Sequence, residues 1–279
     1  MSLMKNKKGL IMGVANERSI AWGIAKELAD QGADLTFTYQ NEGFKKRLIP
    51  LMDSIKAIKC FECDVSNEEH EPNSIENLFK KISSYWNEID FVVHALAFSD
   101  KEELKGKYIN CSRQNFLNSL DISAFSFTRT AKSSFPLMSS KGGSLLTLSY
   151  IGAERTTPNY NVMGVAKAAL ESSVRYLASD FGPLNIRVNA ISAGPMRTLA
   201  GGGITDARAI FNFQKRHSPL RRTVTLNELG GSSIYLLSDL SSGVTGEIHY
   251  VDSGYNIISI PKPDMLHDKS IYDDSSTKK

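Results

Sequence analysis

Short apolar runs alternate along the chain with longer segments in which apolar residues recur at helical spacing. This alternation is typical of βαβ units, which build a parallel sheet. The apolar runs predict strands at residues 10–14, 34–39, 55–61, 89–95, 144–149, 186–191 and 247–251. We therefore expect a seven-stranded parallel sheet.

Predicted helices separate these strands. Residues 20–30 place Ile20, Ile24 and Leu28 on one face, and Gly32 follows as a candidate C-terminal cap. Further helices are predicted at residues 75–86, 115–138, 160–181 and 226–237. Because crossovers between parallel strands are right-handed, the predicted fold class is α/β, with a single Rossmann-type doubly wound domain.

The domain is expected to cover residues 1–262. Three consecutive glycines at 201–203 predict a flexible segment within it. From Pro261 the sequence is Pro-rich and charged without periodicity, so residues 263–279 are predicted to form a flexible C-terminal tail.

Composition and charge narrow the function classes. The 279 residues are 41% hydrophobic, which is ordinary for a globular enzyme with a large core. Because 33 basic and 30 acidic residues nearly balance, we expect no nucleic-acid and no membrane partner. No apolar run approaches the roughly 18 residues that span a bilayer, and Asn16, Glu17 and Arg18 end the N-terminal apolar run.

Cysteine usage points to the cytoplasm. The three cysteines, Cys60, Cys63 and Cys111, form an odd set in a chain with ample core, so a disulfide scaffold is not expected. Cys60 and Cys63 have the spacing of a redox or metal pair, but no second pair exists and the segment ends a predicted strand. We predict no metal site and a reducing, cytoplasmic environment.

The first strand-to-helix turn is a candidate pyrophosphate site. Gly13 permits close backbone approach, and a helix that begins near Ser19 directs free amides toward an anion. The candidate binding residues are Gly13, Ala15, Ser19 and Ile20. A simple tight turn capped by Ser19 remains the alternative, whereas a Walker loop is disfavoured because no Gly-Lys-Ser/Thr follows.

The ends of the next strands are candidates for binding adenosine. Gln40 stands where dinucleotide-binding folds usually carry an acid for the ribose, and no basic residue directly follows it, which favours NADH over NADPH. Lys45, Lys46 and Arg47 nearby leave NADPH as the less favoured alternative. Asp64 and Val65 are candidates for the adenine, although Asp64 could instead cap a helix. Leu96 follows the fourth strand and should lie at the same sheet edge.

Tyr160 and Lys167 are the candidate chemical groups. On a helix, seven residues correspond to about 700° of rotation, so the two side chains would lie on one face, about 10.5 Å apart. A nearby lysine would lower the pKa of the phenol and could donate to the nicotinamide ribose. Tyr160 would then serve as a proton donor or oxyanion stabiliser. Such a pair also occurs by chance on many helices, but its place directly after the fifth strand favours a functional role.

Three segments carry a family resemblance. They are SYIGAERTTPNYNVMGVAK at 149–167, GVANERSIAWG at 13–23 and RVNAISAGPMRTLA at 187–200. In these segments the chain resembles the bacterial enoyl-acyl-carrier-protein reductases, a divergent branch of the short-chain dehydrogenases. The resemblance extends over nearly the whole chain, to about Ser259. Ketoreductases of the wider family use Tyr-x3-Lys, but position 164 is Gly here. That departure argues against carbonyl reduction.

The resemblance implies an NADH-dependent hydride transfer to the β-carbon of trans-2-enoyl thioesters, the last step of the fatty-acid elongation cycle. Tyr160 would stabilise the enolate oxygen, Lys167 would hold the nicotinamide ribose, and Tyr150 would be a second catalytic tyrosine that also contacts substrate. Met163 would line the acyl pocket, with a plain core role as the alternative. Ser99, which departs from the usual family residue, would lie near the thioester.

The resemblance also implies a nicotinamide-binding segment and partners. That segment comprises Met196, Arg197, Thr198, Leu199 and Ala200. It would open into a mobile substrate loop at about 195–212, hinged at the glycines. The implied partner is acyl carrier protein, which is acidic, and Lys215-Arg216 and Arg221-Arg222 are candidate basic patches. The family is usually homotetrameric.

Two other functions stay open. One is a carbonyl-reducing short-chain dehydrogenase, which the Gly at position 164 disfavours. The other is a catalytically silent dinucleotide-binding regulator. The presence of Tyr150, Tyr160 and Lys167 argues against a regulator, because a pure binder needs only pyrophosphate and ribose contacts.

Overall fold

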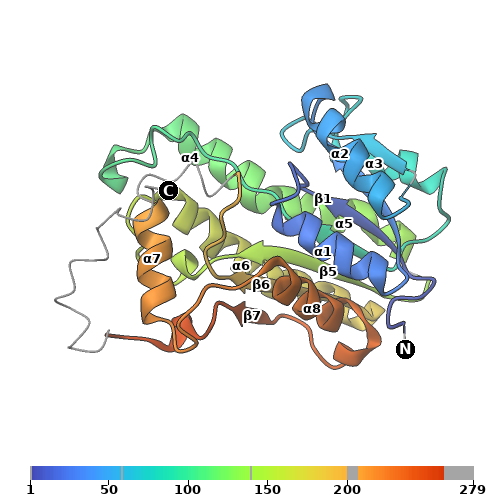
Figure 1. Ribbon diagram of the computed structural model, residues 1–279. Coiled ribbons are helices and arrows are strands. Elements are labelled where there is room, and N and C mark those ends of the chain that lie inside the picture. The colour runs from blue at the N-terminus through green and yellow to red at the C-terminus, as the bar shows by residue number, and fades with distance from the viewer. Residues whose placement is uncertain (1, 58, 139, 200–206, 261–279) are drawn as a thin grey trace.

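A single parallel sheet organises the molecule (Figure 1). The computed structural model describes residues 2–57, 59–138, 140–199 and 207–260. Within these ranges the strand order is β3-β2-β1-β4-β5-β6-β7, and every pairing is parallel. The predicted seven-stranded, doubly wound α/β fold is confirmed. The predicted tail at 263–279 lies outside the described residues.

The strands lie close to their predicted positions. They are β1 (Lys8–Met12), β2 (Asp34–Tyr39), β3 (Lys59–Glu62), β4 (Phe91–His94), β5 (Gly143–Ser149), β6 (Ile186–Ala193) and β7 (Ile248–Val251). The first strand ends at Met12 instead of Val14, because Gly13 turns the backbone with φ of +102°.

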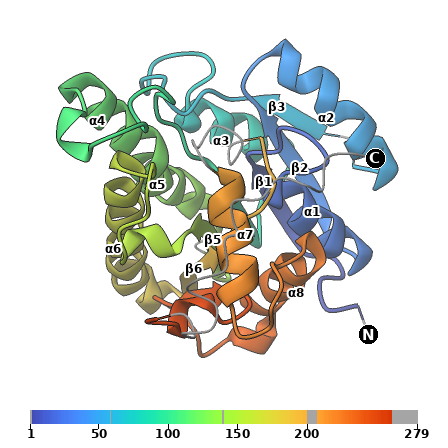
Figure 2. The ribbon, with the colours of Figure 1, turned by 60° about the vertical axis from the view of Figure 1, so that its left-hand side comes forward.

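Helices cover both faces of the sheet (Figures 1 and 2). They are α1 (Ile20–Asp30), α2 (Glu42–Ser54), α3 (Ile75–Ser83), α4 (Arg113–Leu120), α5 (Ser126–Met138), α6 (Val162–Phe181), α7 (Ala207–His217) and α8 (Leu226–Leu237). The predicted bounds of α1 and α8 are confirmed residue for residue, because a clear apolar stripe and polar ends define both helices.

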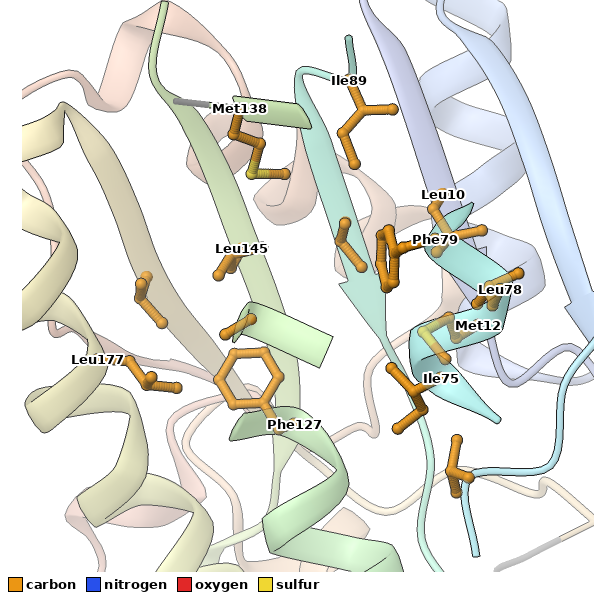
Figure 3. Packing of buried hydrophobic residues seen from close by; sticks show 14 of the residues in the cluster. Leu10, Met12, Ile75, Leu78, Phe79, Ile89, Phe127, Met138, Leu145 and Leu177 are labelled. Carbon is orange, nitrogen blue, oxygen red and sulfur yellow. The ribbon is translucent and has the colours of Figure 1, made fainter. Parts of the chain in front are cut away.

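Alternate residues of β1 point into two separate cores. Leu10 and Met12 pack on one face with residues of α3, α5 and α6 (Figure 3). Ile11 packs on the other face with residues of α1, α2 and α8. The sheet is therefore buried on both faces, as its nearly continuous apolar strands require.

The segment after β2 differs from the prediction. The third strand begins at Lys59, not at residue 55, because α2 runs to Ser54. The Asn41 side chain caps this helix by accepting from the backbone amides of Gly43 and Phe44. Pro50 lies inside α2, a position that usually ends a helix, and it obscured the helical pattern.

Two further helical predictions were incomplete. The helix predicted at 115–138 is interrupted by a π-turn at Asp121–Phe125, which separates α4 from α5. Residues 207–212 of the predicted substrate loop form the first part of α7, which was not predicted. Over the described part of the chain, every helix is too short or too polar to cross a bilayer.

Candidate active site

The turn after β1 meets the end of β4 where the strand order reverses. A Cβ on Gly13 would lie 2.1 Å from the backbone oxygen of Ala95, and its φ is +102°. Only glycine accommodates both conditions. The reversal point of such a sheet is where ligands bind in open α/β folds, so Gly13 lies at the expected place.

Ser19 holds this turn rather than capping α1. Its Oγ accepts from the backbone amides of Ala15 at 2.9 Å and Asn16 at 3.1 Å, and it makes no capping bond to the helix. The Ser19 side chain therefore closes the tight turn, as the structural alternative expected, and does not cap α1. Ile20 begins α1, so the first amides of that helix face the end of a fixed turn, which suits a pyrophosphate.

Gln40 and Asp64, predicted to bind separate parts of adenosine, contact each other. Gln40 Nε2 donates to Asp64 Oδ2 at 2.9 Å, and Ser66 donates to Asp64 Oδ1. Partial burial raises the pKa of the Asp64 carboxyl, but these hydrogen bonds outweigh it and the net pKa is lowered. The next helix, α3, is capped by Ser74, so Asp64 is not its cap.

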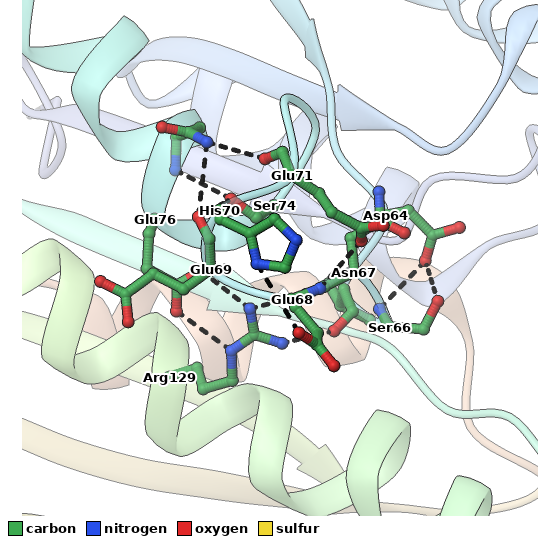
Figure 4. Close-up of polar contacts among 12 residues, drawn as sticks. Asp64, Ser66, Asn67, Glu68, Glu69, His70, Glu71, Ser74, Glu76 and Arg129 are labelled. Atoms are coloured by element: carbon green, nitrogen blue, oxygen red, sulfur yellow. Dashed lines mark hydrogen bonds and ion pairs between the residues drawn. The ribbon is translucent and has the colours of Figure 1, made fainter.

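Arg129 on α5 fixes the loop that carries Asp64 and Val65 (Figure 4). It donates to the backbone oxygens of Val65 at 3.0 Å and Asn67 at 2.8 Å, and it pairs with the Glu76 carboxylate. Sequence reasoning missed this residue, because it lies 64 positions beyond Val65. Leu96, after β4, is half-buried against the same core.

Tyr160 lies before α6, not on it. The helix begins at Val162, and Asn159 and Asn161 both have positive φ, at 57° and 42°. Asparagine tolerates this conformation better than other non-glycine residues. Asn161 Nδ2 also donates to the backbone oxygen of Leu104 at 2.9 Å. The prediction that Tyr160 and Lys167 share a helical face is therefore wrong, although both still lie beyond the end of β5.

The phenol ring of Tyr160 occupies a tight slot. The Tyr150 ring meets it edge-on with centroids 5.1 Å apart. A Cβ on Gly152 would lie 2.6 Å from the Tyr160 ring, and a Cβ on Gly164 would lie 2.7 Å from the backbone oxygen of Gly152. Position 164 thus has no room for the lysine of a Tyr-x3-Lys motif, which supports the argument against carbonyl reduction.

Burial governs the ionisation of Tyr160. Loss of solvent raises its pKa above the usual tyrosine value, and the nearby Tyr150 and Glu171 raise it further. The expectation that Lys167 would lower this pKa is not met. Near neutral pH the phenol keeps its proton, which suits a hydrogen-bond donor to developing negative charge.

Lys167 is buried on α6 beside a carboxylate that sequence reasoning missed. Its Nζ donates to the backbone oxygen of Leu148 at 2.7 Å. Burial lowers the pKa of Lys167 to about 8, and the charge of Glu171 opposes the shift. Glu171 accepts a hydrogen bond from Ser149, the last residue of β5. The lysine can therefore change charge in the physiological range.

Of two further residues proposed to contact substrate, Met163 lies beside Tyr160 and Ser99 lies against α4. Met163 packs with Tyr160 in a small apolar cluster that also includes Leu104 and Val162. Its sulfur lies 3.8 Å from Ser123 Oγ. Ser99 exchanges hydrogen bonds with Asn115. The structure thus brings Met163 to Tyr160 and ties Ser99 to α4.

The predicted nicotinamide segment follows β6. The Thr198 amide donates to the Met196 oxygen at 2.9 Å, and Leu199 is exposed. The Arg197 guanidinium lies 4.9 Å from the centre of the Phe211 ring on α7, so this segment and α7 are in contact. Ala200 and the glycines at 201–203 lie outside the described residues.

A doubly wound parallel sheet, a glycine turn at its reversal point, and a buried tyrosine and lysine beyond β5 define a dinucleotide-dependent oxidoreductase of the short-chain dehydrogenase type. The family model described as "Enoyl-(Acyl carrier protein) reductase" matches residues 13–256. The chain belongs to the family of NADH-dependent enoyl-acyl-carrier-protein reductases.

Relatives and solved structures agree with this assignment. The chain is 59% identical over 264 residues to enoyl-[acyl-carrier-protein] reductase [NADH] 2 of Rhizobium meliloti, covering 95% of this chain and 97% of the relative. It is 52% identical over 260 residues to the enzyme of Rickettsia typhi, covering 93% and 98%. A crystal structure of the Anaplasma phagocytophilum reductase in complex with NAD superposes with a TM-score of 0.89 at 55% identity, covering 93% of this chain and 97% of that one.

Proposed function

We propose that this site reduces the carbon–carbon double bond of a trans-2-enoyl group carried by acyl carrier protein, with Tyr160 as the donor that stabilises the thioester oxygen. The observation that carries this proposal is the slot around Tyr160, in which burial keeps the phenol protonated. NADH, when bound, supplies the hydride that reaches the β-carbon of the substrate.

The chain's own residues would divide the remaining work. As negative charge develops on the thioester oxygen, the Tyr160 hydroxyl donates a hydrogen bond to it. Tyr150 would be a second catalytic and substrate-contacting tyrosine, because its ring is set against that of Tyr160. Met163 and Ser99 would contact the acyl group and the thioester. Tyr160 is 9% exposed, so little water competes for the oxygen.

The residues along the carboxyl ends of the strands fit NADH. Gly13 lets the turn after β1 pack directly against the end of β4, because a Cβ there would clash with the Ala95 carbonyl. The bond between Gln40 and Asp64 presents two polar groups at the adenosine end. Lys167 would hold the nicotinamide ribose. The proposed cofactor-binding set is Gly13, Ala15, Ser19, Ile20, Gln40, Asp64, Val65, Leu96, Lys167 and Met196 to Ala200.

A comparison of two thioesters tests the reaction. NADH absorbance should fall on mixing the enzyme with crotonyl thioester and stay constant with acetoacetyl thioester. Consumption with the ketone alone would establish the carbonyl-reducing alternative. Cofactor binding without turnover of either thioester would instead establish the silent regulator.

Basic residues near α7 are proposed to receive the acidic carrier protein. Lys215, Arg221 and Arg222 are exposed, and the charge of Arg222 is partly neutralised by Glu228. Exposed charges chiefly speed encounter. Charge reversal at Lys215 should therefore raise the Michaelis constant for carrier-bound substrate more than for a coenzyme A analogue. Equal increases would remove this patch from the proposal.

The outer surface of α5 and α6 is proposed to form the interface of a homotetramer. Tyr176 is 74% exposed and Phe125, just before α5, is 55% exposed. Exposed apolar surface of this kind marks protein contacts. Light scattering should give the mass of four chains, and Tyr176→Glu should reduce it. A monomeric wild-type protein would contradict the proposal.

We place the enzyme in the cytoplasm. The three cysteines are free, as expected in a reducing compartment. Cell fractionation should recover the activity with cytoplasmic markers, and recovery with the periplasm would refute the assignment.

A further inference from the structure

Helix α7 faces the site through polar residues. It lies beyond the ends of β5 and β6, as the two views in Figures 1 and 2 show together. The two residues that α7 buries are Gln214 and His217, while its apolar side chains are only partly covered. A helix usually docks through an apolar stripe. Hydrogen bonds as well as packing can therefore decide the position of α7 on the domain.

Gln214 reaches the proposed catalytic machinery directly. Its Nε2 donates to Tyr150 Oη at 2.7 Å, and the residue is 5% exposed. The other half of the amide, Oε1, is buried with no hydrogen-bond partner among the described residues. Such an atom costs about 1–3 kcal/mol. Stability alone thus does not account for a glutamine here, since an apolar side chain of similar size would avoid that cost.

The direction of this hydrogen bond has a chemical consequence. An amide N–H can only donate, so the Tyr150 oxygen is the acceptor. The single phenol proton of Tyr150 is then left to donate elsewhere. Burial raises the pKa of Tyr150 to about 12, despite the opposing effect of hydrogen bonds from Gln214 and Thr157, so that proton is retained near neutral pH.

Aromatic contacts hold the C-terminal part of α7 in place. The centroid of the Phe213 ring lies 6.5 Å from that of Tyr255, which follows β7, and within the helix it lies 4.2 Å from that of His217. In the middle of the helix, Phe211 contacts Arg197 of the nicotinamide segment. A shift of α7 would therefore move Gln214 relative to Tyr150 and disturb the nicotinamide segment together.

We propose that Gln214 is a positioning residue that orients the Tyr150 hydroxyl, leaving its proton free to donate toward the substrate. The inference rests on the proposed catalytic role of Tyr150. It also links the placement of α7 to the readiness of the site, because the hydrogen bond forms only when α7 lies as it does here.

Two substitutions of similar size separate orientation from packing. Gln214→Met removes the donor, and Gln214→Glu replaces it with a carboxylate that only accepts and so attracts the Tyr150 proton. We expect kcat with crotonyl thioester to fall about three- to tenfold in the Met variant, as for loss of one hydrogen bond, and further in the Glu variant. The NADH dissociation constant of the Met variant should stay within about twofold. Asn212→Leu, on the same helix, is the control and should leave kcat unchanged.

A double-mutant cycle with Tyr150→Phe completes the test. If Gln214 acts through the Tyr150 hydroxyl, Gln214→Met should change kcat by less than about twofold in the Phe background. Equal factors in both backgrounds, or equal kcat for the Met and Glu variants, would overturn the inference while leaving the role of Tyr150 intact. A Tyr150→Phe enzyme with wild-type kcat would overturn both.

Discussion

Two buried histidines allow a comparison of two regions: the ends of β4 and β5, which we call the frame of the site, and helix α7. His94, at the end of β4, is fully buried, and its ring nitrogens bond to Thr147 Oγ1 at 3.2 Å and Ser126 Oγ at 2.8 Å. His217, on α7, is 3% exposed, and neither ring nitrogen has a hydrogen-bond partner among the described residues.

The difference indicates what each region is optimised for. The ring and the backbone oxygen of His94 are hydrogen-bonded within the fold, so they contribute to stability and hold the ends of β4 and β5 in register. The buried face of α7 leaves polar atoms of Gln214 and His217 without a hydrogen-bond partner among the described residues, which costs stability. We therefore expect substitutions in the frame to affect folding and substitutions on α7 to affect turnover.

The largest expected contrast is between His94→Leu and His217→Leu. The first should lower the free energy of unfolding by about 3 kcal/mol, because Thr147 and Ser126 lose a buried partner. The second should change it by less than about 1 kcal/mol, because within the part of the chain that the structure describes the His217 ring has no hydrogen bond to lose. Denaturant unfolding of both variants measures the contrast, and equal losses would remove the distinction between the regions.

The contribution of His94 to stability should also depend on pH. Burial first, and the charge of Lys167 second, lower the pKa of His94 to about 3. In the unfolded chain His94 binds a proton near pH 6.5, whereas in the folded chain it stays neutral at that pH. The free energy of unfolding therefore falls as pH drops below that value. Between pH 6.5 and 4.5 this histidine should account for about 2 kcal/mol. His94→Gln should show a shallower loss than wild type, and parallel pH curves would contradict the assignment.

The slot around Tyr160 predicts the next effect. A Cβ at Gly164 would meet the Gly152 oxygen at 2.7 Å, whereas one at Gly231, in α8, meets nothing within 4 Å. Gly164→Ala should lower the free energy of unfolding by about 1–2 kcal/mol and reduce kcat. Gly231→Ala should raise stability by about 0.5–1 kcal/mol with unchanged kcat. Thermal unfolding and steady-state rates measure the two effects. Equal changes in the two variants would show that position 164 is not constrained by the slot around Tyr160.

The charge of Lys167 predicts the smallest effect. Its pKa of about 8 means that the ammonium loses its proton as pH rises through that value. Affinity for NADH should then weaken about tenfold between pH 7.5 and 9.5 if the charged form holds the ribose. Lys167→Arg stays charged and should give a flatter profile. Fluorescence titration of NADH compares the slopes, and equal slopes would exclude Lys167 as the titrating group.

Local patterns explain which features the sequence could predict. The bounds of α1 and the end of β5 follow from apolar periodicity and polar boundaries, which are encoded within a few residues. The conformation of Tyr160 was mispredicted because Asn159 and Asn161 take positive φ in a segment that otherwise reads as helix.

Contacts distant in sequence were beyond prediction. Gln214 bonds to Tyr150 across 64 positions, and Arg129 reaches Val65 across another 64. Neither residue belongs to a recognisable motif, because its role depends on where its helix packs. The need for glycine at position 164 likewise becomes clear only when the Gly152 carbonyl is seen beside it.

The most direct test of the central claim is the rate of crotonyl thioester reduction by Tyr160→Phe. The protonated phenol should be the main donor to the thioester oxygen, so kcat should fall on the order of 100-fold, while the NADH dissociation constant and the thermal unfolding midpoint stay close to wild type. Because this substitution removes the hydroxyl and keeps the aromatic ring, a kcat equal to that of wild type would contradict the account.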